Sequence, residues 1–358
     1  MAVALPSTSR EIQLADLPGG LPGPEHFTIT QKPVPLPGPG QVVVQNRYFL
    51  VFPGLRTLIG GQADGVPLPR IHAGDALFGP AVGEVVAAAP SGPLRPGDIV
   101  THMLGWREHA LVAAADCAPL GDVLPDPVAH LSSGSAAYGA LTRLAEVRPG
   151  DTVFVTGAAG AVGTLAGPVA RLLSAGRVVG STRSPENAER LRAELGYDAV
   201  VVPGPRSIDE QLASAAPEGI DVLLDTVGGD QLTAAVRAAR RGARFALVGA
   251  LSGQLSPRRD GGSALAEIGT FRLVNQGVSL HGYSGRTTPR YRRNGPSASG
   301  SGCAPTRSPS RMCGSRAWTT RPGRCGNCSR GGTSGPSSWS CRQGDVSSRA
   351  VAANEAET

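Results

Sequence analysis

An alternation of strand-like and helix-like runs over residues 151–250 limits the folds available to this chain. Five short apolar runs have the length and composition of buried strands: DTVFVTG (151–157), RVVGSTR (177–183), DAVVVP (198–203), DVLLDTV (221–227) and ARFALVGA (243–250). The runs between them repeat apolar residues at helical spacing: 161–175, 185–195, 207–216 and 231–241. Strands that alternate with helices at this spacing form βαβ units, which predicts an α/β fold with a parallel sheet.

The chain before this region has a different pattern. Residues 27–120 contain short apolar runs interrupted by Pro and Gly, such as QVVVQNRYFLVF, GEVVAAAP and GDIVTHML. This pattern indicates short antiparallel strands. Residues 127–147 are expected to be helical, and VSLHGYS (278–284) is the last convincing strand. We therefore expect a β-rich domain over 1–126, a nucleotide-binding domain over 127–284, and a separate tail over 285–358.

The glycine-containing turn VTGAAGAVG (155–163) joins the first of these strands to its helix. Gly157 permits a tight turn, Gly160 lets the backbone approach a diphosphate, and Gly163 lets the helix pack closely against the sheet. The helix N-terminus offers free N–H groups to phosphates. Small residues also occur wherever helix and strand pack tightly, but the strand–turn–helix context favours dinucleotide binding. Ala159 belongs to the same predicted turn.

The end of the second strand indicates which dinucleotide is bound. An NAD site usually has an acidic residue there for the ribose 2′-hydroxyl. This chain has Ser181, Thr182 and Arg183 instead. Hydroxyl and guanidinium groups suit a 2′-phosphate. A solvated surface arginine is the alternative, and we predict NADP(H) as the cofactor.

Several motifs together resemble the medium-chain dehydrogenase/reductase superfamily: GWREHA (105–110), SAAYGAL (135–141), AAGAVG (158–163), GIDVLLDTVGG (219–229) and ALVGALSG (246–253). The chain is most similar to the zinc-independent, NADPH-dependent alkenal/one reductases. That group includes leukotriene B4 12-hydroxydehydrogenase/prostaglandin reductase and plant double-bond reductases. The resemblance implies a GroES-like catalytic domain, a Rossmann domain, a C-terminal return into the first domain, and an active site in the cleft between them.

The resemblance also implies a reaction and its site residues. An activated C=C bond of an enone, enal or enoyl compound would receive hydride at its β-carbon. The diphosphate contacts would fall on Gly160, Ala161 and Val162. Two further strand ends would border the ribose and nicotinamide: Asp225, Thr226 and Val227, and Gly249, Ala250 and Leu251. An NADPH quinone reductase and a catalytically impaired NADPH-binding paralogue are the alternatives.

Two tyrosines are candidates for supplying or orienting the proton. Tyr138 lies on a predicted small-residue helix before the Rossmann domain, and Tyr48 is the second candidate. Tyrosines packed in the interior with their hydroxyls on backbone groups are the alternative for both. The run LVFPGLR (50–56) departs from the Ser-Asp-Pro-Tyr-Met-Arg pattern of the reductases. Pro53 and Arg56 match it, but the acid and the tyrosine are replaced, which leaves the substrate open.

Cysteine usage and charge separate the tail from the rest of the chain. Residues 1–284 contain only Cys117 and no Gly-His-Glu stretch, so we expect no metal site. Residues 285–358 hold 12 Arg, three acidic residues and the other five of the six Cys. The net positive charge therefore belongs to the tail, and it does not indicate a nucleic-acid-binding body. The single body thiol and the lack of a long apolar run predict a cytoplasmic protein without a membrane span. A small-molecule substrate and a homodimer are expected.

The codons of the tail can encode a more protein-like sequence in another reading frame. A zinc ribbon would need two regularly spaced ligand pairs, and only Cys325 and Cys328 form one. A basic nucleic-acid-binding arm is the other alternative. When the third base of each codon is read with the next two bases, residues 312–341 can encode VRV-x-GLDDAPRALRELLAGRHFGTVVVEL. That output predicts helices followed by a strand. We therefore predict a frameshifted, disordered tail and a chain that lacks elements needed to complete its sheet.

Overall fold

The computed structural model describes residues 5–60, 68–90, 92–121, 124–256 and 264–283, together with the backbone of Ser338–Ser340. The described residues form two units. The first contains the described residues up to Leu131, with Ser256 and the strand Ser338–Ser340. The second contains Ser132–Leu255 and residues 264–283. The predicted division after residue 126 falls just before the division between these units.

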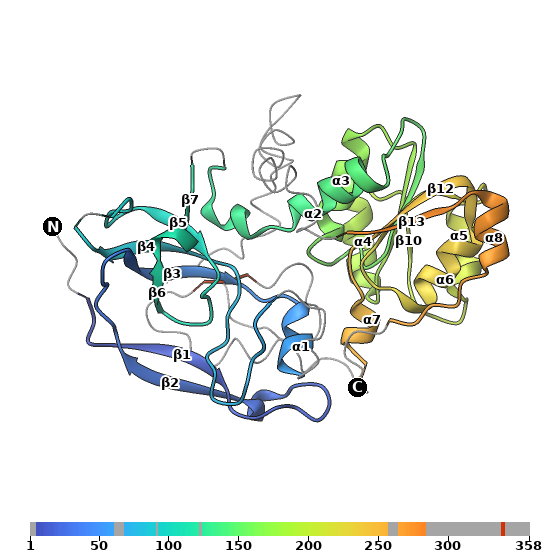
Figure 1. Cartoon of the computed structure of the whole chain (residues 1–358). Helices are drawn as coiled ribbons and strands as arrows, with labels where there is room; N and C mark the ends of the chain where they lie inside the picture. Colours follow the sequence, from blue (N-terminus) through green and yellow to red (C-terminus); the bar gives the residue numbers. More distant parts are fainter. Residues whose placement is uncertain are drawn as a thin grey trace. The chain divides into compact units, whose positions relative to one another are not determined.

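The first unit is built from antiparallel strands, as the interrupted apolar runs predict (Figure 1). One pair consists of β1 (Thr8–Leu14) and β2 (Phe27–Pro33). A larger sheet has the order β14-β3-β4-β5-β7, and β6 also pairs with β3. Its strands are β3 (Gln41–Leu50), β4 (Ala81–Ala88), β5 (Ile99–His102), β6 (His109–Ala113), β7 (Ala118–Pro119) and β14 (Ser338–Ser340). The described residues of this unit also form four short helices: α1 (Gly54–Ile59), η1 (Pro24–His26), η2 (Ala114–Asp116) and η3 (Pro127–Leu131).

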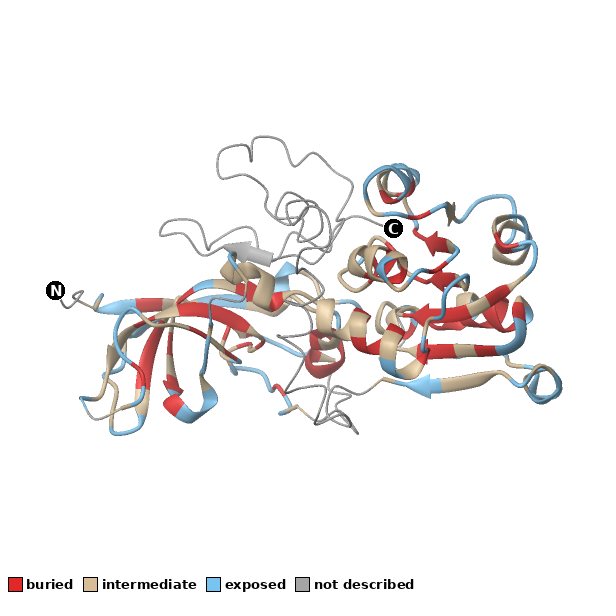
Figure 2. Cartoon of the chain, turned by 90° about the horizontal axis from the view of Figure 1, so that it is seen from above, coloured by how far each residue is buried: buried red, intermediate tan, exposed pale blue. Residues whose placement is uncertain are grey.

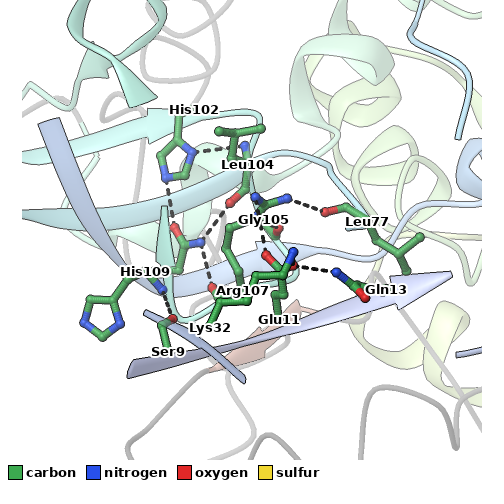
Figure 3. Close-up of polar contacts among 11 residues, drawn as sticks. Ser9, Glu11, Gln13, Lys32, Leu77, His102, Leu104, Gly105, Arg107 and His109 are labelled. Atoms are coloured by element: carbon green, nitrogen blue, oxygen red, sulfur yellow. Dashed lines mark hydrogen bonds and ion pairs between the residues drawn. The ribbon is translucent and has the colours of Figure 1, made fainter. Parts of the chain in front are cut away.

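A buried polar network holds the loop that follows β5 (Figure 3). Asn46 of β3 donates to the carbonyls of Leu104 and Arg107 at 3.0 and 2.8 Å. His102 contacts the Asn46 side-chain oxygen at 2.8 Å, and its Nδ1 accepts from Leu104 N at 3.1 Å. Arg107 donates to the carbonyls of Leu77 and Gly105. The side chains thus pair the backbone polar groups of a loop that belongs to no sheet.

The second unit contains six parallel strands in the order β10-β9-β8-β11-β12-β13. These are β8 (Thr152–Val155), β9 (Arg177–Ser181), β10 (Ala199–Val201), β11 (Ile220–Asp225), β12 (Ala239–Leu247) and β13 (Ser279–Gly282). The helices are α2 (Gly134–Gly139), α3 (Gly163–Leu172), α4 (Pro185–Glu194), α5 (Ile208–Ala215), α6 (Gly229–Arg237), α7 (Leu251–Gln254) and α8 (Thr270–Gln276). The predicted α/β class and parallel sheet are confirmed, although β12 begins before the predicted run.

Both faces of the parallel sheet are covered, which explains why its strands are continuously apolar. Val153 and Val155 of β8 pack on one face with Ala166 of α3. Phe154, between them, packs on the other face with Leu212 of α5. Figure 2 shows buried residues running along these strands. The carboxyl ends of β8, β11 and β12 therefore meet at one edge of a rigid sheet, where ligands of such folds bind.

Two expectations need correction. Residues 127–147 do not form one helix: a short 3-10 helix η3 (Pro127–Leu131) precedes α2, and a π-helical turn (Ala140–Leu144) follows it. The sheet also has six strands within the described residues, with β13 at its edge, so it does not depend on the tail for them. Apart from Ser338–Ser340, the predicted tail lies outside the described residues. No described helix is both long and apolar enough to cross a bilayer.

Candidate functional site: the dinucleotide turn of the second unit

The turn after β8 is shaped by two glycines that no other residue could replace without strain. Gly157 has φ of +60°, and a Cβ there would lie 2.6 Å from Oγ1 of Thr226. A Cβ on Gly163 would lie 2.5 Å from Cα of Ala158, because α3 starts directly against the turn. The predicted roles of these glycines, a tight turn and close helix packing, therefore match the local geometry.

The turn leaves a set of backbone donors available. The N–H of Gly157 donates to Ser181 Oγ, that of Ala158 to the Ser181 carbonyl, and that of Gly160 to the Gly157 carbonyl. Four other N–H groups at the turn have no acceptor among the described residues: those of Ala159, Ala161, Val162 and Gly163. Adjacent free N–H groups at a helix start favour an anion. All four residues are among those predicted from the sequence.

Ser181 has a different task from the predicted one. Its side chain is 3% exposed at the end of β9. The hydroxyl accepts from Gly157 N at 3.0 Å and donates to Gln231 Oε1 at 2.5 Å. Because both roles of the hydroxyl are taken, Ser181 fixes the turn rather than presenting a free group to a 2′-phosphate. Arg183 lies two residues beyond the carboxyl end of β9 and is exposed.

The side chain of Asp225 also forms its hydrogen bonds within the protein. Its carboxylate is 1% exposed and accepts from Thr156 Oγ1 at 2.5 Å. It further accepts from the backbone N–H groups of Val227 and Gly228 at 3.0 Å each. The carboxylate therefore holds the loop between β11 and α6, and any contribution of Asp225 to ligand binding runs through that loop.

The two predicted strand ends come together at one edge of the sheet. Gly249 N donates to the Asp225 carbonyl at 3.1 Å, and Leu251 N donates to the Thr226 carbonyl at 3.1 Å. A Cβ on Gly249 would lie 2.8 Å from the Thr226 carbonyl oxygen. Thr226 in turn donates from Oγ1 to the Thr156 carbonyl at 2.8 Å. Val227 and Ala250 belong to the same pair of loops, which border the turn after β8.

Tyr197 is a contributor to this site that the sequence reasoning missed. Its side chain is 3% exposed, and its hydroxyl donates to the Gly163 carbonyl at 2.6 Å. Burial raises the pKa of the hydroxyl above its ordinary value, although a hydrogen bond from Gly167 N opposes this. A Cβ on Gly167 or Gly180 would lie 2.5 or 2.8 Å from the ring. The hydrogen bond from the hydroxyl to the Gly163 carbonyl therefore holds the first turn of α3.

The two proton-donor candidates lie in different units. Tyr48 is half-buried on β3, opposite Val82 of β4. Tyr138 is half-buried on α2, and its carbonyl accepts from Thr142 Oγ1 at 2.6 Å. Neither hydroxyl has a hydrogen-bond partner among the described residues. Within the described part of the chain, both hydroxyls are therefore available, as a proton donor requires.

The donor groups at the turn suit a coenzyme. The free N–H groups of the turn fit the diphosphate of a dinucleotide, and Gly160 is the residue predicted to let the backbone approach that diphosphate. The described residues include no group of three or more His, Cys, Asp and Glu side chains that could hold a metal ion. Burial raises the pKa of the Cys117 thiol to about 11, with Asp116 adding to the shift.

An antiparallel β unit followed by a parallel sheet with a glycine-containing turn is an arrangement that suits a dinucleotide-dependent enzyme. Residues 10–120 match the family described as the N-terminal domain of oxidoreductase, and residues 161–295 match the zinc-binding dehydrogenase family. The chain belongs to the medium-chain dehydrogenase/reductase superfamily and is an NADP-dependent oxidoreductase of that superfamily.

Three relatives support this assignment. YfmJ of Bacillus subtilis (strain 168), named as an NADP-dependent oxidoreductase, is 35% identical over 252 residues, 69% of this chain and 73% of YfmJ. The NADPH-dependent curcumin reductase of Escherichia coli (strain K12) is 30% identical over 250 residues, 68% of this chain and 71% of that protein. The crystal structure of CurA from Vibrio vulnificus in complex with NADPH superimposes with a TM-score of 0.70 at 25% identity, covering 81% of this chain and 86% of CurA.

Proposed function

We propose that this chain reduces an activated C=C bond of a small molecule at the expense of NADPH. The observation that carries the proposal is the set of four free N–H groups at Ala159, Ala161, Val162 and Gly163, which suits a diphosphate. The choice of acceptor is supported by the curcumin reductase relative, because curcumin is an unsaturated diketone. Enones, enals and enoyl compounds share this electron-poor double bond.

Bound NADPH supplies the hydride, and the protein supplies position and protons. The turn after β8 holds the diphosphate, and Tyr197 and Ser181 keep that turn in place through their hydroxyls. Hydride addition to the β-carbon leaves an enolate, which needs hydrogen-bond donors and then a proton at the α-carbon. The free hydroxyl of Tyr138 is the first candidate donor and that of Tyr48 the second.

We further propose that Arg183 contributes to the preference for the 2′-phosphate. It follows β9 at the position where NAD-binding chains usually have an acidic residue. A guanidinium can pair with a phosphate through two hydrogen bonds. The engagement of Ser181 with Gln231 leaves this recognition to Arg183 and its neighbours.

Steady-state assays test the function directly. NADPH oxidation is followed with a trans-2-alkenal, an alkyl enone and a benzoquinone, and the products are identified by mass. We expect the saturated carbonyl product from the first two and a clear preference for NADPH over NADH. Turnover of the quinone alone would instead support a quinone reductase, and tight NADPH binding without turnover would support an impaired paralogue. Tyr138→Phe should lower kcat about 100-fold if this hydroxyl donates the proton.

Two further expectations remain proposals. A homodimer is supported by the edge strand β13 and by the neighbouring helix α8, where Phe271 and Val274 are 79% and 78% exposed. An apolar surface beside a strand edge that has no partner in the described part of the chain favours pairing with another chain. Analytical ultracentrifugation would show a single species of twice the chain mass. A cytoplasmic location is supported by the single cysteine of residues 1–284.

A further inference from the structure

Arg56 of α1 is a buried cation. Its side chain lies among the buried residues of a short helix in which Leu55, Thr57, Leu58 and Ile59 are also buried. Only 9% of Arg56 is exposed. Neighbouring side chains in this part of the unit form an apolar core. A charged group in such surroundings is costly unless an opposite charge or a full set of hydrogen bonds compensates it.

The described residues give the Arg56 guanidinium little compensation. Nη2 donates to the Gly20 carbonyl at 2.7 Å. Nε is inaccessible to solvent and has no acceptor. No Asp or Glu of the described residues lies within ion-pair distance of Arg56. Burial alone lowers the pKa of the group from its ordinary value, with no neighbouring charge opposing it.

Arg107 in the same unit shows how a buried arginine is normally accommodated. It donates to the carbonyls of Leu77 and Gly105, and its Nη1 lies 3.9 Å from Glu11 Oε2. Among the described residues, Arg107 therefore has two carbonyl acceptors and an opposite charge nearby, whereas Arg56 has one carbonyl acceptor and no opposite charge. Gly60 also clears space beside Arg56, because a Cβ there would lie 2.5 Å from Nη1.

We propose that Arg56 binds an anionic group of the substrate, a carboxylate carried by the activated alkene. The inference rests on the proposed function and names the class of acceptor. A carboxylate offers the two oxygens that match the fork of unused N–H groups on a guanidinium. The residues suited to the coenzyme lie in the second unit. We therefore assign Arg56, a cation of the first unit, to the substrate rather than to the coenzyme.

A matched pair of substrates tests this assignment. The probes are trans enones whose alkyl chain ends in a carboxylate, with spacers of increasing length, and the methyl ester of each. The ratio of kcat/KM for acid over ester should reach about 10- to 100-fold at the best spacer, the value of a charge-assisted hydrogen bond. In Arg56→Met the ratio should fall to about one. In Arg56→Lys, which keeps the charge but not the fork, it should be intermediate.

Arg47→Met is the matched control. Arg47 is exposed on β3 and forms an ion pair with Glu84, so its loss should leave the acid-to-ester ratio unchanged. The proposal is overturned if the wild-type ratio is one at every spacer length, or if Arg56→Met or Arg56→Lys retains the wild-type ratio. A purely structural tether to Gly20 would lower turnover of acid and ester by the same factor.

Failure of the proposed function gives a different result. If neither acid nor ester is reduced, the assay becomes calorimetric titration of the NADP⁺ complex with the saturated keto acid and its ester. Arg56 would then still be assigned to the anion if the acid binds about 10-fold more tightly and Arg56→Met removes that difference. Equal binding of acid and ester would overturn the assignment of Arg56.

Discussion

The buried imidazole of His102 should make the first unit sensitive to mild acid. The side chain is 4% exposed. Nδ1 accepts from Leu104 N, so the ring proton sits on Nε2 and is donated to Asn46. Only the neutral ring fits this arrangement, because protonation would place a second N–H against the Leu104 N–H. Burial first, and then the charge of Arg107, lower the pKa of His102 from 6.5 to about 4.

The sign and size of the effect follow from the two pKa values. The unfolded chain takes up a proton as the pH falls below 6.5, whereas the folded chain does so only near 4. Neutral His102 therefore makes its full contribution to the free energy of unfolding above the unfolded pKa. This contribution is lost progressively as the pH falls toward the folded pKa. At 1.36 kcal/mol per pKa unit, the loss amounts to about 2 kcal/mol at pH 5 and about 3 kcal/mol near pH 4.

The assay compares the wild type with His102→Gln. The glutamine amide can donate and accept, but it does not titrate. The free energy of unfolding is measured by urea titration followed by circular dichroism, near neutral pH and at about pH 5. We expect the variant to be less stable near neutral pH and the gap to narrow by about 2 kcal/mol at the lower pH. His72→Gln, at an exposed histidine, is the control. Parallel pH profiles for wild type and His102→Gln would refute the reasoning.

Three further predictions concern the coenzyme turn. Tyr197→Phe removes the hydrogen bond to the Gly163 carbonyl and should raise the Kd for NADPH about 5-fold, while the Kd for adenosine 2′-monophosphate, which lacks the diphosphate, stays constant in the same fluorescence titration. Gly163→Ala places a methyl group against Ala158 and should weaken NADPH binding by more than about 10-fold; unaltered binding would contradict the close packing of α3. Arg183→Ser should raise the Kd for NADPH about 10-fold and leave that for NADH unchanged, whereas equal losses for both coenzymes would remove Arg183 from 2′-phosphate recognition.

Much of the fold of the second unit follows from the sequence because its strands are buried on both faces. Val153, Phe154 and Val155 point alternately into two different cores, so the whole strand must be apolar and is easily recognised. The turn could be predicted as well, because a side chain at Gly157 or Gly163 would collide with Thr226 or Ala158. Short elements such as α1 and α7 carry too few residues to show a period, and they were not predicted.

The roles of polar residues at the site were harder to predict. Ser181 lies 50 residues from its partner Gln231, and Asp225 lies 69 residues from Thr156. Sequence alone shows a hydroxyl or a carboxylate at a strand end, but not whether a distant group already occupies it. Tyr197 was missed for the same reason, since its partner Gly163 becomes a neighbour only when β9 and β10 pair beside α3. The residue types were therefore predictable at this site, and their hydrogen-bond partners were not.

Strand β14 lies in the tail that we predict to be frameshifted, and it therefore bears on that prediction. Ser338–Ser340 pairs antiparallel with β3, with Ser338 opposite Leu50 and Ser340 opposite Tyr48. The codons of residues 336–341 can read Val-Val-Val-Glu-Leu in the alternative frame. Backbone pairing is open to both sequences, and the alternative frame would supply β-branched valines, which suit a strand.

A chain that carries the alternative frame across the tail should therefore be more stable than the present chain, because this strand would pack apolar side chains on the sheet. Thermal unfolding and NADPH turnover of the two chains, expressed side by side, measure the difference. A chain ending at residue 286 separates the benefit of the restored segment from the removal of the present one. If the restored chain unfolds at the same temperature as the truncated chain, the alternative frame does not encode a structural element of this protein.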